Sequence, residues 1–326
     1  GQNAGKTTQG VGSVAVGSTA GQTTQGAGSI AVGNLAGQNT QGADSIAIGN
    51  NAGNTSQSAG STAVGPAAGH SAQGSRSTAL GYSAGSTTQG ESAVAVGQNA
   101  GSTTQSIYSV AMGYYAGNNT QGASSVAVGQ QAGRTTQGSN STAIGYYAGN
   151  TTQGAGSVAV GNQSGRINQA TECVALGPYA GYTGQLGTAI AIGKEAGYTG
   201  QKAGGLAIGN NAGYSNQGER AFALGLQAGK TNQGTFSIAI GNSAGKTNQG
   251  AYGIILSTKT VAVDDTTVGH IHIASSLASI DYTSTAGEWT ATVGSTTETI
   301  FTKEALQAVV AASSDFADFQ SRVAAL

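Results

Sequence analysis

The chain has 326 residues, of which 56 are Gly, 5 are Phe and 1 is Trp, with 8% charged residues and a net charge of -1. This composition is not that of a globular enzyme. Disorder driven by charge repulsion is also excluded, because the net charge is near zero and Val, Ile and Ala recur throughout. Two prolines, without Gly at every third residue, exclude collagen. The chain is therefore either low-complexity sequence or a structural repeat.

A repeat of sixteen residues runs from Gly1 to Leu256 without insertion or deletion, which makes sixteen copies. We number the repeat positions 1 to 16 from Gly1. Positions 1 and 5 are Gly and position 9 is Gln in every copy, whereas positions 4 and 15 are Ala with one exception each. A fixed period of this kind indicates one structural unit per copy.

Repeat positions 13 to 16 predict one short strand per copy, with β-branched residues on one face and Ala on the other. The remaining positions predict turns and a second short extended segment, with glycines at corners that need positive φ or close backbone approach. Pro66 and Pro178 both occupy position 2, which therefore need not donate to a ladder. We predict an all-β fold in which residues 1–256 form a parallel β-solenoid, or β-roll, whose coils pair about 4.8 Å apart.

The invariant Gln is predicted to be structural. Its amides can bond to one another along a column, or they can satisfy corner carbonyls inside the coil. A thin roll with one Val/Ile face and one Ala face cannot bury both within a single chain. One face is therefore expected to contact a partner chain, and we predict a homotrimer.

The strand motif Ser-Val-Ala-Val-Gly occurs at residues 13–17 and 125–129, and as Ser-Ile-Ala-Val-Gly at 29–33. It resembles the head repeats of trimeric autotransporter adhesins, which centre on Ser-Val-Ala-Ile-Gly and form a left-handed parallel β-roll in a trimer. The adhesin unit is commonly shorter, and the sixteen-residue form is similar to repeats in tail fibres and surface fibres of phages and large viruses. The resemblance covers residues 1–256.

The period ends at Ser257. Short alternating segments in residues 257–300 predict a β-rich cap or tip module, and residues 301–326 predict a C-terminal helix with Thr302 as its N-cap. No run of roughly 18 apolar residues occurs, so no membrane span is expected. Gly1 opens on a repeat boundary without an initiator Met or a signal peptide, as expected for a fragment of a longer chain.

His270-Ile271-His272 is the predicted metal-binding pattern. Alternate residues of a strand face the same side, so three such pairs around a threefold axis would supply six nitrogens, which suits octahedral iron. The pattern is similar to the His-x-His pairs that bind iron on the axis of trimeric phage fibres and spikes. The alternative is two solvated or hydrogen-bonded histidines.

Tyrosines recur at fixed repeat positions. Tyr182, Tyr198 and Tyr214 occupy position 6 in three successive copies, which predicts an aromatic column that stacks on sugar rings or contacts another protein. The alternative is that they stabilise turns or cover a neighbouring coil. Two further sets share position 2 or position 3 at intervals of 32 residues: Tyr82, Tyr114 and Tyr146, and then Tyr115, Tyr147 and Tyr179.

Other candidate sites have a structural interpretation. Cys173 occupies position 13, where most copies have Ser, which predicts a small buried side chain rather than a reactive thiol. Asp264 and Asp265 predict an exposed turn, and the Gly-rich stretches do not form a strand-loop-helix phosphate cradle. No recurring carboxylate pair or Ser-His-Asp set suggests an enzyme.

The sequence therefore predicts a structural and adhesive fibre, in which a rigid trimeric rod attaches to a host or cell surface. The expected partners are further copies of the chain, a cell-surface glycan or receptor protein, and other fibre or virion components, without nucleic acid. The expected location is extracellular, on a virion tail or surface fibre or on a cell surface. The alternatives are a filament subunit without a receptor, a polysaccharide depolymerase, and an ice-binding solenoid suggested by the interrupted Thr column at position 7.

Overall fold

The computed structural model describes residues 1–257, 263–269, 271–274, 278–283, 288–293 and 296–301. The chain divides into two compact units, Gly1–Ala189 and Ile190–Leu326, here called the N-terminal and C-terminal units. The described residues form strands and turns and no helix, which confirms the predicted all-β class.

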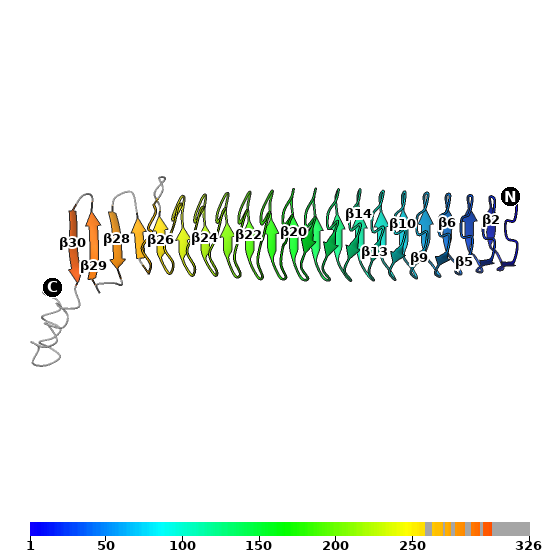
Figure 1. Ribbon diagram of the computed structural model, residues 1–326, viewed down its shortest axis with the longest axis horizontal. Coiled ribbons are helices and arrows are strands. Elements are labelled where there is room, and N and C mark those ends of the chain that lie inside the picture. The colour runs from blue at the N-terminus through cyan, green and yellow to red at the C-terminus, as the bar shows by residue number, and fades with distance from the viewer. Residues whose placement is uncertain (258–262, 270, 275–277, 284–287, 294–295, 302–326) are drawn as a thin grey trace, which may run out of the picture. The chain divides into compact units, whose positions relative to one another are not determined.

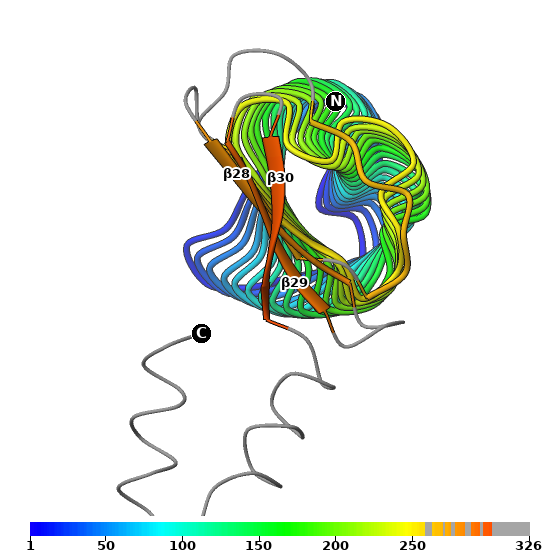
Figure 2. The same cartoon turned by 90° about the vertical axis from the view of Figure 1, so that its left-hand side faces the viewer.

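The N-terminal unit is a parallel β-solenoid in which each copy of the repeat forms one coil (Figure 1). Two sheets run along the stack: the Ala sheet at repeat positions 14–16, and the Gln sheet at positions 8–9. Every strand pairs in parallel with its counterpart sixteen residues away, as in Ala15 with Ala31 and Gln9 with Gln25. Viewed along the stack, the coils of this unit superpose with a gradual rotation (Figure 2).

The Ala-sheet strands of this unit are β2 (Val14–Val16), β4 (Ile30–Val32), β6 (Ile46–Ile48), β8 (Thr62–Val64), β10 (Thr78–Leu80), β12 (Val94–Val96), β14 (Val110–Met112), β16 (Val126–Val128), β18 (Thr142–Ile144), β20 (Val158–Val160) and β21 (Val174–Leu176). The Gln-sheet strands are β1 (Thr8–Gln9), β3 (Thr24–Gln25), β5 (Thr40–Gln41), β7 (Ser56–Gln57), β9 (Ala72–Gln73), β11 (Thr88–Gln89), β13 (Thr104–Gln105), β15 (Thr120–Gln121), β17 (Thr136–Gln137) and β19 (Thr152–Gln153).

The interior of each coil is small and partly polar. The alanines at positions 4 and 15 are fully buried from Ala20 onward, and they pack with the Gln of position 9 and the small residue of position 13. In the strand Ile46–Ile48, Ala47 is buried while the two isoleucines lie on the outer face. The predicted separation of an Ala face from a Val/Ile face is therefore confirmed.

The buried Gln side chains link successive coils. Gln25 Nε2 donates to the Val14 carbonyl of the preceding coil at 2.7 Å and to the Ser29 carbonyl at 3.4 Å. In part of the column the amides also bond to each other, as Gln89 Nε2 does to Gln105 Oε1 at 3.1 Å. Both predicted roles are present, and the bond to a backbone carbonyl is the recurring one. Buried carbonyls that lacked this donor would destabilise the coil.

Two glycine positions have distinct steric reasons. At position 1, Gly33 has φ 133°, and a Cβ there would lie 2.5 Å from the Gly49 carbonyl oxygen of the next coil. At position 5, Gly37 has φ 52°, and a Cβ would lie 2.7 Å from Oε1 of Gln41. A side chain at position 5 would therefore enter the space that the buried Gln of position 9 fills, which favours Gly there.

The Gln sheet ends at β19 because the residue at position 8 changes. The first ten coils have Thr, Ser or Ala there, whereas Asn168 and Gly184 follow with φ values of 55° and 69°. A left-handed residue interrupts a strand, and Asn and Gly adopt that conformation readily. Ile167 and Thr183 accordingly pair through a single bridge.

The C-terminal unit contains parallel Ala-sheet strands followed by antiparallel ones. The parallel strands are β22 (Ile190–Ile192), β23 (Leu206–Ile208), β24 (Phe222–Leu224), β25 (Ile238–Ile240), β26 (Ile254–Ser257) and β27 (Ile271–Ala274). The antiparallel strands are β28 (Ala278–Thr283), β29 (Glu288–Val293) and β30 (Thr296–Phe301). At position 8 this unit has Gly or Asn in every coil, again with positive φ.

Strands β27 to β30 thus extend the Ala sheet of the C-terminal unit beyond the last repeat, in parallel through β27 and then in antiparallel pairs. The predicted domain boundaries after residues 256 and 300 stay predictions. Phe301 is the last residue of β30, and the predicted C-terminal helix of residues 301–326 otherwise lies outside the described residues.

Candidate binding surface

The outer face of the Ala sheet carries an aliphatic or Met side chain at position 16 of every coil and an apolar side chain at position 14 of every coil except those with Thr62, Thr78 and Thr142. In the N-terminal unit, four of the larger residues at position 16, Ile48, Leu80, Met112 and Ile144, are 39 to 45% exposed, and the fifth, Leu176, is half-buried. They alternate with half-buried valines in the intervening coils. A largely apolar sheet face therefore remains uncovered within one chain, as the sequence predicted for the side that contacts a partner.

The predicted column of Tyr182, Tyr198 and Tyr214 is divided between the two units. In the C-terminal unit, the Tyr198 and Tyr214 rings stack with centroids 4.9 Å apart and an interplanar angle of 2°. Nζ of Lys230 lies 5.8 Å from the Tyr214 ring centroid. In the N-terminal unit, Tyr182 packs against Tyr179 at 5.9 Å. All three predicted tyrosines are half-buried against neighbours, and their role in binding stays a prediction.

Aromatic rings and arginines meet at the edge of the N-terminal unit that carries positions 2, 3 and 6. Tyr114 and Tyr115 form an edge-to-face pair with centroids 4.5 Å apart. The guanidinium of Arg134, in the next coil, lies 5.5 Å from the Tyr115 ring centroid. Arg134 also donates to Oε1 of Gln131 at 3.0 Å. Repeat spacing indicated the tyrosines but not the arginine.

The same arrangement recurs 32 residues later. Tyr146 and Tyr147 form an edge-to-face pair at 4.4 Å, and the Arg166 guanidinium lies 5.0 Å from the Tyr147 centroid. Arg166 donates to Oε1 of Gln163 and to the Tyr182 hydroxyl, both at 2.7 Å. One signal could have revealed both arginines, because Arg134 and Arg166 occupy position 6 with the spacing of the tyrosines.

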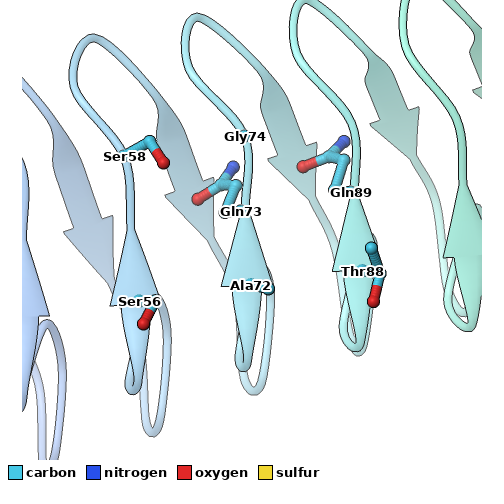
Figure 3. Close-up of a pocket in the computed structure, with 7 residues that line it drawn as sticks. All are labelled: Ser56, Ser58, Ala72, Gln73, Gly74, Thr88 and Gln89. Carbon is cyan, nitrogen blue, oxygen red and sulfur yellow. The ribbon is translucent and has the colours of Figure 1, made fainter.

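A small pocket of about 180 Å³ opens on the Gln sheet at β7, β9 and β11 (Figure 3). It exists because Ser56 and Ala72 replace the longer Thr that occupies position 8 in neighbouring coils. Its lining residues are Ser56, Ser58, Ala72, Gln73, Gly74, Thr88 and Gln89. None of these is charged or aromatic, and the two glutamines already bond to backbone carbonyls. The pocket follows from residue size in the repeat and offers no reactive group.

The predicted histidine pair is only partly described. His272 lies half-buried on β27, in register with Ile255 on β26 and Asp281 on β28. His270 lies outside the described residues. Within the described part of the chain, no three His, Cys, Asp or Glu side chains gather closely enough to hold a metal ion. Iron bound on a trimer axis stays a prediction, and metal analysis of the purified protein would check it.

Cys173 is fully buried at position 13 of its coil. Its thiol lies 3.2 Å from the Leu186 carbonyl oxygen, and its backbone N–H donates to Ser157 Oγ, also at 3.2 Å. Burial raises the pKa of the thiol and so disfavours the nucleophilic thiolate. The prediction of a small buried side chain is confirmed.

Several segments of the repeat region match a known protein family. Residues 72–100, 89–116, 121–148 and 137–164 match the family model described as YadA head domain repeat. These segments of the N-terminal unit are similar to YadA head repeats. The matches lie within the N-terminal unit and include both Tyr114 and Tyr146, so they confirm the resemblance drawn from the strand motif. No match was found among curated proteins or among solved structures. Among the described residues, no helix is long and apolar enough to cross a membrane.

Proposed function

We propose that this protein is an adhesive fibre whose YadA-type repeats form a rigid homotrimeric rod that attaches to a host or cell surface. The observation that carries the proposal is the half-exposed apolar face of the Ala sheet. This face recurs in every coil of the N-terminal unit, and two further copies of the chain would cover it. The repeat family supports an extracellular or surface location and a trimer.

The solenoid suits this role mechanically. Each coil is bonded to its neighbours by parallel backbone ladders and by a buried Gln, so the stack keeps a fixed spacing along its length. Three rods side by side would also present three copies of any weak binding surface, which increases the apparent affinity. The proposed function requires no catalytic group.

The assembly is tested by the mass of the particle in solution, measured by analytical ultracentrifugation. We expect a trimer for the intact chain, and a shift toward monomer when Met112→Asp and Ile144→Asp place charges on the outer Ala-sheet face. Tyr108→Asn is the matched control, because Tyr108 is 57% exposed at position 12 and Asn is compatible with its φ of 57°. A monomeric intact chain would overturn the proposed rod.

Attachment is tested separately, by binding of the labelled protein to bacterial and animal cells. Saturable binding supports an adhesin. A trimeric rod that binds no surface would instead indicate the purely structural filament, which shares the same fold and assembly. A shortened host polysaccharide after incubation with the protein would indicate a depolymerase.

A further inference from the structure

The edge of the N-terminal unit contains two copies of one four-residue arrangement, here called the Tyr–Arg modules. Each has a Tyr pair at positions 2 and 3, and a Gln and an Arg at positions 3 and 6 of the next coil. The first module is Tyr114, Tyr115, Gln131 and Arg134, and the second is Tyr146, Tyr147, Gln163 and Arg166.

The two modules share their contacts as well as their residue types. In both, the Tyr rings meet edge to face, with interplanar angles of 78° and 70°. In both, the Arg lies over the second Tyr and donates to the Gln. These contacts hold the rings and the guanidinium in one orientation before any ligand arrives, which lowers the entropic cost of binding.

The solenoid does not require these residues. Its interior repeats every sixteen residues, whereas the modules repeat every 32, and the other coils have mostly amide or hydroxyl residues at the same positions. Tyr115 and Tyr147 also adopt φ values of 56° and 54°, a conformation that Asn51 and Asn99 occupy at the same repeat position. A bulky residue in this region costs about 1–2 kcal/mol, which Asn largely avoids. Tyrosine is therefore present at a conformational cost.

The chemistry of this edge favours an anionic, ring-containing ligand. Positions 2, 3 and 6 contain no Asp or Glu through the first twelve coils, and their Lys and Arg residues there are Lys6, Arg134 and Arg166. Tyr114 and Tyr146 are 44% and 43% exposed, so their faces are open to contact. Nε of Arg134 is buried, with no hydrogen-bond partner among the described residues. Aromatic faces, amides and guanidinium groups together recognise sugar rings that carry carboxylate or sulfate groups.

We propose that the Tyr–Arg modules bind a linear anionic polysaccharide that runs along the stack of coils, with one sugar repeat on each module. Successive modules are two coils apart, a distance of about 10 Å along the stack. Two matching sites at this separation fit a polymer with a regular repeat of similar length, and linked weak contacts add to give avidity. This inference rests on the proposed role in surface attachment and names the ligand class for it.

Single-stranded nucleic acid also stacks on aromatic rings beside arginines, but it requires a continuous basic groove along its backbone. Here the edge of the N-terminal unit contains only one lysine, Lys6, and two arginines at positions 2, 3 and 6, and the chain has a net charge of -1. A carboxylated polysaccharide such as hyaluronan needs fewer cations, because each of its disaccharide repeats carries a single carboxylate. The polysaccharide is therefore the favoured ligand, and single-stranded DNA serves as a competing probe.

The test is biolayer interferometry of the full chain on immobilised hyaluronan, heparin, dextran and single-stranded DNA. We expect binding to hyaluronan or heparin that weakens with salt, and none to neutral dextran. Binding to hyaluronan alone would identify a carboxylate ligand, and binding to heparin alone a sulfate ligand. Absence of binding to both anionic polysaccharides, equal binding to dextran, or tighter binding to DNA would overturn the proposal.

Variants locate the site. The double variant Tyr114→Ser/Tyr146→Ser is expected to weaken polysaccharide binding by about tenfold or more, because it removes one stacking platform from each linked module. Arg134→Gln/Arg166→Gln is expected to weaken binding and flatten its salt dependence. Tyr108→Asn, on the opposite edge, is the control and should leave binding unchanged. Unchanged binding in both double variants, with folding verified by circular dichroism, would overturn the assignment of the site.

The same variants separate this inference from the proposed function. If they remain trimeric and still attach to cells as the unmodified chain does, the modules are not the attachment site, while the adhesive rod stands. If the unmodified chain is monomeric or attaches to no cell, the proposal of an adhesive rod is wrong. The polysaccharide measurement then still tests, independently, whether the Tyr–Arg modules bind the polymer.

Discussion

The interior and the tyrosine-bearing edge of the same coils follow different periods. The buried Ala, Gln and Gly recur every sixteen residues, while Tyr114 and Arg134 recur after 32. Each coil must satisfy the same backbone and packing requirements, so the shorter period is the one that folding imposes. The longer period of 32 residues has another origin. Residues at the edge can vary with function because the packing of the coil does not require them.

The interior should be the less tolerant region, and Gly113→Val tests this most severely. A Cβ at Gly113 would lie 2.7 Å from the Gly129 carbonyl oxygen of the next coil, at φ 128°. Strain and overpacking together should lower the free energy of unfolding by about 4 kcal/mol, measured by urea denaturation.

Gly184→Ala is the matched control for that substitution. Gly184 also has positive φ, at 69°, but a Cβ there would have no atom within 4 Å. Gly184→Ala should therefore lower the free energy of unfolding by only the conformational cost of a left-handed residue, about 1–2 kcal/mol. Equal losses for the two variants would show that contact between coils does not determine the glycine at position 1.

Gln121→Glu tests the polar part of the interior. Gln121 Nε2 donates to the Val110 carbonyl at 2.7 Å, and a carboxylate would face that oxygen without a proton to donate. Burial raises the pKa of such a carboxyl above its value in the unfolded chain, so stability is present at low pH and is lost as the pH rises. A pKa raised by about two units would lower the free energy of unfolding by about 3 kcal/mol between about pH 4 and pH 7.

Thr120→Glu provides the comparison for this pH dependence. Thr120 is the neighbouring residue on β15, and its side chain is exposed. A carboxylate there remains solvated, so the unfolding free energy should show little additional change with pH. The burial argument would be wrong if Gln121→Glu and Thr120→Glu gave parallel pH profiles.

Tyr115→Asn should have a smaller effect, and one of opposite sign. Asn occupies the same repeat position at Asn99, and it adopts the left-handed conformation more readily than Tyr. Relief of that strain should raise the free energy of unfolding by about 0.5–1 kcal/mol, partly offset by the lost ring contacts, as seen by urea denaturation. A loss of more than about 1 kcal/mol would assign the Tyr–Arg module to stability.

Periodicity alone was enough to predict the coil, its parallel register and the buried Ala and Gln columns, because each is the same in every copy. It did not predict the end of the Gln sheet, which depends on the replacement of Thr152 by Asn168 at position 8. That signal was present in the residue types, but a change in backbone conformation needs conformational preferences rather than a count of matching positions.

The candidate site was less predictable for a geometric reason. Arg134 lies over Tyr115 although they are nineteen residues apart and occupy different repeat positions. The turn at positions 2–5 and the stacking of one coil on the next bring position 6 beside position 3. Sequence spacing therefore indicated the recurring tyrosines, while the pairing of each with an arginine depended on the shape of the turn.

Cys173→Ser should be the mildest change, because Ser occupies position 13 in most copies and donates there to a backbone carbonyl, as Ser125 Oγ does to Gly122 at 2.6 Å. We expect the free energy of unfolding to change by less than about 1 kcal/mol, whereas Cys173→Leu should lose about 1–3 kcal/mol by overpacking. The native thiol should react with a thiol reagent only as fast as its coils open, since it is buried and its raised pKa keeps it protonated. Immediate reaction in the absence of urea would place Cys173 at the surface, and would contradict the division between an invariant interior and a variable edge.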